Sequence, residues 1–214
     1  MNAERYQAVV VGAGLVGAAT ALALSRQGLR VALVERAEPV APTAEWDARI
    51  YALTPANQRL LASLGAWARM DASRVQPVYR MDVAGDGNGH VRLDAYASGT
   101  AQLAFIFESG RLQQALWEAL IEGGEVAVHC PAAISTLERD GGDTHIRLDD
   151  GRTLAAQLVI GADGTHSRIR DWAGLTATVS PYGQSGTVAN FECEKPHRGT
   201  AFQWFFDSDI LAFL

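Results

Sequence analysis

The chain has 214 residues, 48% of them hydrophobic, and a formal net charge of −6. This length allows one large domain, or one domain with part of another. Because no basic cluster is present, the counterion release that drives nucleic-acid binding has little to act on, and nucleic acid is not an expected partner. Cys130 and Cys193 match no CxxC or Cys/His spacing, so we expect neither a disulfide framework nor a metal site.

The apolar stretch of residues 8–24 is long enough to raise the alternatives of a signal peptide or a membrane span. It contains Gly12, Gly14 and Gly17 and lacks a basic flank and a cleavage site. The pattern instead predicts a strand at Gln7–Val11, a tight turn and an Ala- and Leu-rich helix at Leu15–Arg26. A second buried strand follows at Val31–Val34, which completes a right-handed βαβ unit.

The turn of this unit carries the motif GxGxxG, and an acidic residue ends the next strand. Gly12 permits the tight turn, Gly14 lets the backbone approach a pyrophosphate, and Gly17 permits close packing of helix and strand. The helix N-terminus offers N–H groups to the phosphates, and Glu35 would accept hydrogen bonds from ribose hydroxyls. The candidate dinucleotide-binding residues here are Gly12, Ala13, Gly14, Leu15, Val16, Gly17, Glu35 and Arg36. This motif does not distinguish FAD from NAD.

Two more helices have recognisable ends. Thr54 is the predicted N-cap of a helix that starts at Pro55 and ends at Gly65. Ser109 is the predicted cap of a helix that ends at Gly123 and Gly124. Between them, residues 78–107 have strand-like runs broken by a glycine-rich turn at residues 85–89, which suggests an excursion into a neighbouring antiparallel sheet.

The remaining chain is predicted to be mostly strand. Val126–His129 and residues 158–162 have the pattern of buried strands, with a hairpin turn at Asp149–Gly151 before the second of them. Residues 187–214 again look antiparallel. The chain stops within an apolar run at residues 210–214, and we expect truncation because such a strand needs a partner.

The segment Leu158–Arg170 delivers an acid-glycine turn, Asp163-Gly164, from the end of a buried strand, and Ser167 is placed to cap a short segment after that turn. Taken with GxGxxG upstream, it resembles the glutathione-reductase type FAD domain of flavoprotein aromatic hydroxylases. The resemblance implies that Asp163 lies near the ribose and pyrophosphate of FAD, and that the turn also serves NAD(P)H. Without the resemblance, an ordinary strand end with a loop remains the alternative.

Four further segments narrow the resemblance to the ubiquinone-biosynthesis ring hydroxylases, whose fold is of the para-hydroxybenzoate hydroxylase type. They are Asp47–Trp67, Tyr182–Gln184, Glu192–Glu194 and Thr200–Phe205. The resemblance implies an α/β fold, with a Rossmann-like FAD-binding domain and part of an antiparallel substrate domain. The expected boundaries are residues 1–75 and 107–180 for the FAD-binding domain, 76–106 for the excursion, and 181–214 for the start of the substrate domain.

The same resemblance implies that Arg49 and Arg111 approach FAD and that the backbone at Ala133 contacts adenine. Arg111 also has a physical reason to meet an anion. It falls in the first turn of its helix, where a cation opposes the macrodipole. The alternatives are a solvated or salt-bridged Arg49 and a surface Arg111.

The implied reaction is hydroxylation of a polyprenylated phenol with O2 and NAD(P)H, with FAD carrying the chemistry and with no catalytic acid or base assigned in this chain. A cytoplasmic location is expected, with peripheral association with the inner membrane or a complex with other ubiquinone-biosynthesis enzymes as further expectations. We expect the 214-residue chain alone to bind FAD weakly and not to turn over. The alternatives are a reductase or halogenase of the same fold, an NAD-dependent dehydrogenase, and a non-catalytic scaffold.

Overall fold

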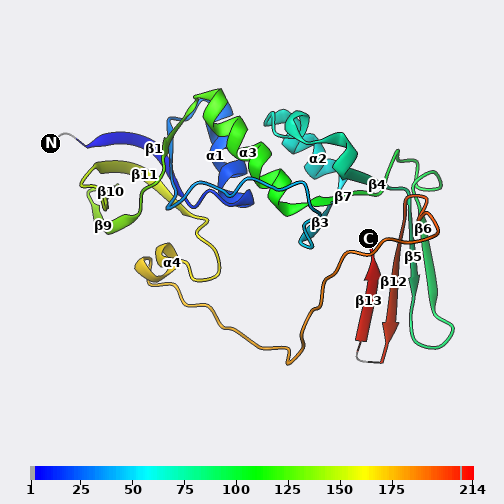
Figure 1. Ribbon diagram of the computed structural model, residues 1–214. Helices are drawn as coiled ribbons and strands as arrows, with labels where there is room; N and C mark the ends of the chain where they lie inside the picture. Colours follow the sequence, from blue (N-terminus) through cyan, green and yellow to red (C-terminus); the bar gives the residue numbers. More distant parts are fainter. Residues whose placement is uncertain (1–2, 208) are drawn as a thin grey trace.

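The structure is a computed structural model that describes residues 3–207 and 209–214 (Figure 1). Its helices are α1 (Leu15–Arg26), α2 (Pro55–Ser63), α3 (Ser109–Gly123) and α4 (Arg168–Trp172), with 3-10 turns at Trp67–Arg69 and Ala72–Arg74. Its strands are β1 (Glu4–Val11), β2 (Val31–Val34), β3 (Ile50–Leu53), β4 (Val75–Val78), β5 (Arg80–Ala84), β6 (His90–Asp94), β7 (Ala104–Glu108), β8 (Val126–His129), β9 (Ile134–Asp140), β10 (Asp143–Leu148), β11 (Thr153–Gly161), β12 (Thr200–Phe206) and β13 (Asp209–Phe213).

The largest sheet has the strand order β8-β2-β1-β11-β10-β9. The pairs β8·β2, β2·β1 and β1·β11 are parallel, and β10 joins β11 and β9 in antiparallel pairs. The predicted βαβ unit is therefore confirmed, with the helix and the second strand at the predicted bounds. Because β1 is central, its carboxyl end lies between those of β2 and β11, where parallel sheets place their ligands.

Both faces of this sheet are covered. Alternating residues such as Val31 and Leu33 pack with α1 and α3 on one face, in a cluster that includes Leu116 and Leu120. Ala32 and Val34 pack on the other face against residues of β9, β10 and β11, including Ile146. Residues that point alternately into two buried layers explain why β2 is apolar at every position.

The remaining strands form two smaller sheets beyond the N-terminal end of α3 (Figure 1). β3, β7 and β4 are antiparallel, whereas the sheet β13-β12-β5-β6 is mixed, because β12 runs parallel to β5. The expected antiparallel pairing of residues 187–214 is thus right for β12·β13 and wrong for β12·β5. Within the described chain, residues 187–199 form no strand, and Phe191 is 80% exposed.

Two helix starts are capped by the predicted side chains. The hydroxyl of Thr54 accepts a hydrogen bond from the N–H of Asn57 at the start of α2, and that of Ser167 accepts one from Arg170 at the start of α4. The predicted cap Ser109 is wrong by one residue: it is the first residue of α3, and the N-cap is Glu108. In the part of the chain described here, no helix combines the length and apolarity needed to cross a membrane.

Candidate dinucleotide site

Two loops meet at the carboxyl ends of β1 and β11. Val11 pairs with Gly161 across these parallel strands, and the N–H of Ala162 donates to the carbonyl of Val11 over 2.8 Å. A β-carbon added at Gly12 would lie 3.0 Å from the Cα of Asp163. The glycine-rich turn and the acid-glycine turn are therefore in direct contact.

Each glycine of the motif has its own geometric reason. Gly12 has a φ of +99°, a region that disfavours residues with a β-carbon. A β-carbon at Gly17 would lie 1.9 Å from the carbonyl oxygen of Gly12, so only glycine allows α1 to approach β1 this closely. At Gly14, by contrast, no described atom beyond its own neighbours lies within 4 Å of that position. The space there is open to a ligand.

The N-terminus of α1 faces this open space. Gly14 is its N-cap and is exposed, and the Val16 side chain is 73% exposed. Glycine has no side chain with which to satisfy the first N–H groups of the helix. The backbone from Gly14 through Leu15 and Val16 can therefore receive an anion.

Glu35, at the end of β2, is attached to the same turn. Its Oε2 accepts a 2.7 Å hydrogen bond from the N–H of Ala13, and its Oε1 accepts one of 2.7 Å from the N–H of Arg36. The carboxylate lies beside the glycine-rich turn. Its Oε1 also accepts a 3.2 Å hydrogen bond from the N–H of Ala37, so Oε2 is the oxygen with a lone pair left for a ligand hydroxyl.

A cavity of about 490 Å³ opens next to Glu35. Its lining residues are Arg36, Pro131, Ala132, Ala133, Asp149 and Asp150. The N–H of Ala133 donates to the Asp149 carboxylate over 3.0 Å, and the N–H of Ala132 donates to the carbonyl of Glu35 over 2.8 Å. The structure thus places the predicted residues Arg36 and Ala133 in one cavity.

Asp163 is held inward by its own turn. Its carboxylate accepts hydrogen bonds from the Ser167 hydroxyl and from the N–H groups of Arg168, at 2.8 Å, and Ile169, at 3.3 Å. Burial raises the pKa of Asp163, but these hydrogen bonds outweigh it, and the net pKa is lowered. The residue remains ionised and fixes the start of α4 beside Gly161, at the end of β11.

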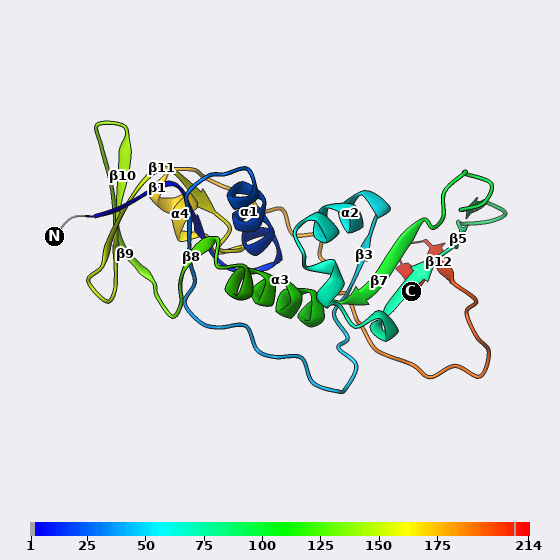
Figure 2. The same ribbon diagram turned by 90° about the horizontal axis from the view of Figure 1, so that it is seen from above.

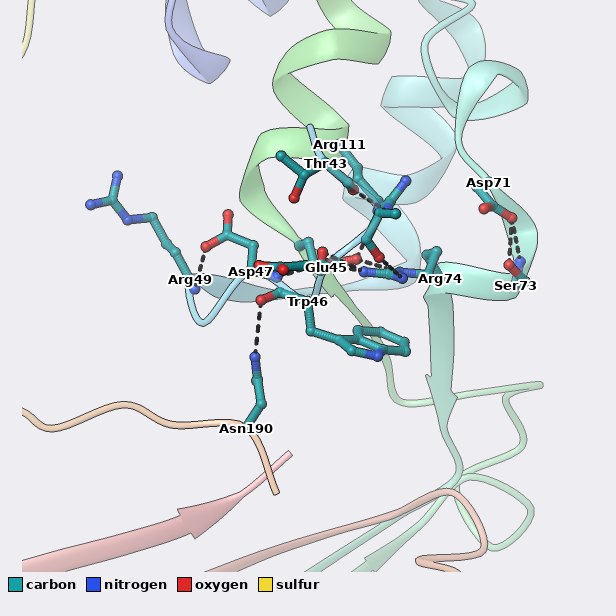
Figure 3. A network of polar contacts seen from close by, with 12 residues as sticks. Thr43, Glu45, Trp46, Asp47, Arg49, Asp71, Ser73, Arg74, Arg111 and Asn190 are labelled. Atoms are coloured by element: carbon teal, nitrogen blue, oxygen red, sulfur yellow. Dashed lines mark hydrogen bonds and ion pairs between the residues drawn. The ribbon is translucent and has the colours of Figure 1, made fainter. Parts of the chain in front are cut away.

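Arg111 meets an anion, as its position in α3 suggested, and that anion belongs to the chain (Figure 3). Its Nε donates to Oε2 of Glu108 over 2.8 Å, and only 17% of its side chain is exposed. Arg74 donates to the same carboxylate through Nε, at 2.7 Å, and through Nη2, at 2.6 Å. Arg111 is therefore engaged in an ion pair within the chain, at a partly buried position.

Arg49 differs from Arg111. Its side chain is exposed and points away from the cluster of Figure 3, while its backbone N–H donates to Asp47 over 2.9 Å. The structure brings the predicted residues of the two turns and the cavity together, and it leaves Arg49 beyond the first turn of α3. A ligand that contacts both regions must extend past the glycine-rich turn.

Sequence reasoning missed Glu108 and Gln113. Glu108 is 3% exposed, and Gln113 donates through its Nε2 to the carbonyl of Ala13. The sequence does contain a signal for Glu108, because a carboxylate ends the otherwise apolar strand Ala104–Glu108 three residues before an arginine. Its second partner, Arg74, is 34 positions away and no local pattern identifies it.

A family model described as "FAD binding domain" matches residues 5–204. Among curated proteins, the chain is 34% identical to 3-demethoxyubiquinol 3-hydroxylase of Escherichia coli, over 100% of this chain and 55% of that protein. It is 33% identical to ubiquinone hydroxylase UbiL of Rhodospirillum rubrum, over 96% of this chain and 48% of that protein. The chain therefore spans about half the length of these relatives.

Solved structures show the same fold. PqsL of Pseudomonas aeruginosa superimposes with a TM-score of 0.68 at 28% identity, over 84% of this chain and 48% of that one. The p-nitrophenol 4-monooxygenase PnpA of Pseudomonas putida gives a TM-score of 0.64 at 23% identity, over 81% and 45%, and so supports the fold alone. The predicted fold class and the predicted resemblance to ubiquinone-biosynthesis hydroxylases are confirmed, and the chain belongs to the FAD-binding-domain family.

Proposed function

We propose that this chain binds the adenosine and pyrophosphate portion of FAD in a monooxygenase that hydroxylates an aromatic ring in ubiquinone biosynthesis. The observation that carries the proposal is the contact between the turns at Gly12 and Asp163, with Glu35 attached to the first of them. One adenine dinucleotide can engage all three at the carboxyl ends of β2, β1 and β11.

Each part of the site has a proposed role. The pyrophosphate binds over Gly14 to the N–H groups at the start of α1, where the helix dipole favours negative charge. Glu35 accepts hydrogen bonds from the adenosine ribose, and the cavity between Arg36 and Ala133 holds adenine. In this arrangement Asp163 lies next to the ribose and pyrophosphate of FAD. Arg49 and Arg111 lie toward its flavin ring.

The bound flavin supplies the redox chemistry, using NAD(P)H as reductant and O2 as the source of the new hydroxyl oxygen. The protein's part is to bind, to orient the ring and to exclude water. The names of the relatives support a ubiquinone precursor as substrate, and a polyprenylated phenol is the chemical class we propose. Such a substrate favours peripheral association with the inner membrane or a complex with other enzymes of ubiquinone biosynthesis.

We also propose that residues 1–75 and 107–180 form the FAD-binding domain. In this division, residues 76–106 and 181–214 belong to the substrate domain. Two of the sheets support it, because every strand of the six-stranded sheet lies within residues 1–75 and 107–180, and every strand of the sheet β13-β12-β5-β6 lies within residues 76–106 and 181–214.

The test compares the 214-residue chain with the protein expressed from its complete gene. We expect the complete protein to quench flavin fluorescence stoichiometrically and to oxidise NAD(P)H with a phenol, incorporating one oxygen atom from 18O2. We expect the 214-residue chain to bind FAD weakly without turnover. Flavin binding with a reduced or halogenated product would instead indicate another oxidoreductase of this fold, and partner capture without flavin would indicate a scaffold.

A further inference from the structure

Glu108 binds a backbone group in addition to Arg74 and Arg111. Its Oε1 also accepts a 2.8 Å hydrogen bond from the backbone N–H of Asp47, so four donors converge on one buried carboxylate. Burial by itself raises the pKa of Glu108, but hydrogen bonds from Arg74, Asp47 and Arg111 lower it to about 2. The carboxylate is therefore ionised at neutral pH and lies between two cations.

The two arginines also donate hydrogen bonds to the backbone of the segment Thr43–Asp47. Arg111 donates through Nη2 to the carbonyl of Thr43 over 3.1 Å. Arg74 donates to the carbonyls of Ala44, over 3.2 Å, and Glu45, over 3.1 Å. The guanidinium of Arg74 also lies 3.5 Å from the centre of the Trp46 ring. Figure 3 shows these backbone groups gathered around the two guanidinium groups.

Outside this cluster the segment is also held by Asn190, whose Nδ2 donates to the carbonyl of Trp46 over 3.3 Å (Figure 3). The segment belongs to the connection between β2 and β3, residues 35–49, which runs alongside α3 (Figure 2). Residues 41–47 are exposed and have no regular secondary structure. Most hydrogen bonds to residues 43–47 therefore lead back to Glu108.

The segment lies at a defined place relative to the dinucleotide site. The first turns of α3 contact the glycine-rich turn, because Gln113 donates to the carbonyl of Ala13. Arg111, in the first turn of α3, donates to the carbonyl of Thr43, so the segment Thr43–Asp47 lies at this end of the helix. The adenine cavity lies across the sheet from α3, because its lining residue Ala132 packs with Val34 in the cluster on the face opposite α1 and α3. Thr43–Asp47 therefore borders the glycine-rich turn on the side away from that cavity, where the flavin half of the dinucleotide would continue.

We propose that Glu108 is a positioning residue that holds Arg111 and the segment Thr43–Asp47 in place for the flavin half of FAD. This inference rests on the proposed function. Without the carboxylate, two guanidinium groups would face each other unneutralised, and the backbone N–H of Asp47 would lose its acceptor. The cluster would open, and residues 43–49 would lose the conformation that meets the ligand.

The two halves of the ligand provide the test. The dissociation constants of FAD and of ADP are measured for the protein expressed from its complete gene and for its Glu108→Gln variant. We expect FAD to bind at least tenfold more weakly to the variant and ADP to bind within twofold of the original. A general loss of structure would weaken both ligands, whereas a failure of positioning weakens only the ligand that carries a flavin.

Glu122→Gln is the matched control, since Glu122 is also on α3 and also pairs with an arginine, Arg69, but is 64% exposed. It should leave both constants unchanged. Should Glu108→Gln fold poorly, Trp46→Leu removes the ring beside Arg74 from an exposed position and should weaken FAD about threefold, with ADP again unchanged.

The outcomes are distinguishable. If the original protein binds neither FAD nor ADP, the proposed function fails. If it binds both, and Glu108→Gln binds FAD as well as before or more tightly, the positioning role of Glu108 is wrong. Equal weakening of FAD and ADP in both Glu108→Gln and Trp46→Leu also overturns it, because the effect then reaches the whole domain.

Discussion

The β-carbon position of Gly12 lies 2.4 Å from the carbonyl oxygen of Ala162, well inside any tolerated contact. The two residues are 150 positions apart in sequence, yet each follows the last residue of a strand in the same parallel pair. A glycine at position 12 is therefore required by the partner loop as well as by its own φ of +99°. One residue determines both the shape of the turn and the approach of the second loop.

Gly12→Ala should destabilise the protein strongly. The positive φ costs about 1–2 kcal/mol for a residue with a β-carbon, and the clash with Ala162 adds to this. We expect a loss of at least about 3 kcal/mol in the free energy of unfolding, within the range of severe single substitutions. Gly28→Ala is the control, because Gly28 has a φ of +82° but open space around its β-carbon position. Equal losses in urea unfolding would show that the loop contact does not matter.

Gly14→Val should separate stability from cofactor binding. Gly14 has a φ of −61° and an unobstructed β-carbon position, so a side chain there costs the fold less than about 1 kcal/mol. The same side chain would occupy the space proposed for the pyrophosphate, and FAD affinity should fall at least tenfold. Gly123→Val, at the far end of α3, also adds a side chain in open space and should leave flavin binding unchanged. Flavin titration alongside urea unfolding measures both effects, and tight FAD binding by Gly14→Val would contradict the proposed path of the ligand.

Local chemistry explains what the sequence predicted well. The bounds of α1 follow from Gly14 at its N-cap and Gly28 beyond its end, and Pro55 after Thr54 gives the start of α2. These signals act within a few residues, so no tertiary information is needed to read them. The proximity of Gly12 and Asp163 was also predictable, because each ends a strand with the pattern of a buried parallel sheet.

Long-range pairing explains what the sequence did not predict. The parallel pair β5·β12 joins Arg80 to Thr200, 120 positions away, and alternation of apolar residues carries no information on strand direction. The sequence placed the cap of α3 at Ser109 because serine is a common N-cap residue. The N-cap is instead Glu108, whose side chain pairs with Arg74 and Arg111 and does not cap the helix. Burial of a charge depends on partners that the local pattern does not reveal.

His129 should give the protein a pH dependence near neutrality. Its Nδ1 lies 2.7 Å from Nη1 of Arg152, which can only donate, so Nδ1 accepts and the proton sits on the buried Nε2. Burial, and next the charge of Arg152, lower the pKa of His129 below its usual 6.5. The neutral ring is favoured in the fold, so this contribution to stability is present above pH 6.5 and is lost as the pH falls through the lowered pKa.

The measurement is an NMR titration of the ring together with unfolding at several pH values. The His129 resonance should titrate below pH 6.5, and Arg152→Gln should move its midpoint upward because a nearby cation is removed. His129→Phe should abolish the part of the stability loss that occurs just below pH 6.5. A midpoint at or above 6.5 in the original protein would contradict the buried, arginine-bonded ring.

Glu108 should govern stability in a more acidic window. Its pKa is lowered from 4.5 to about 2, so its contribution is fully present above pH 4.5 and is lost as the pH falls through about 2. Such a shift corresponds to about 3 kcal/mol at neutral pH. Glu108→Gln should therefore be less stable than the original protein by about that amount at pH 7, and the difference should shrink as the pH approaches 3. Urea unfolding from pH 7 to pH 3 measures this, with Glu122→Gln as the exposed counterpart. A difference that stays constant over this range would mean that Glu108 stabilises the fold through its shape and not through its charge.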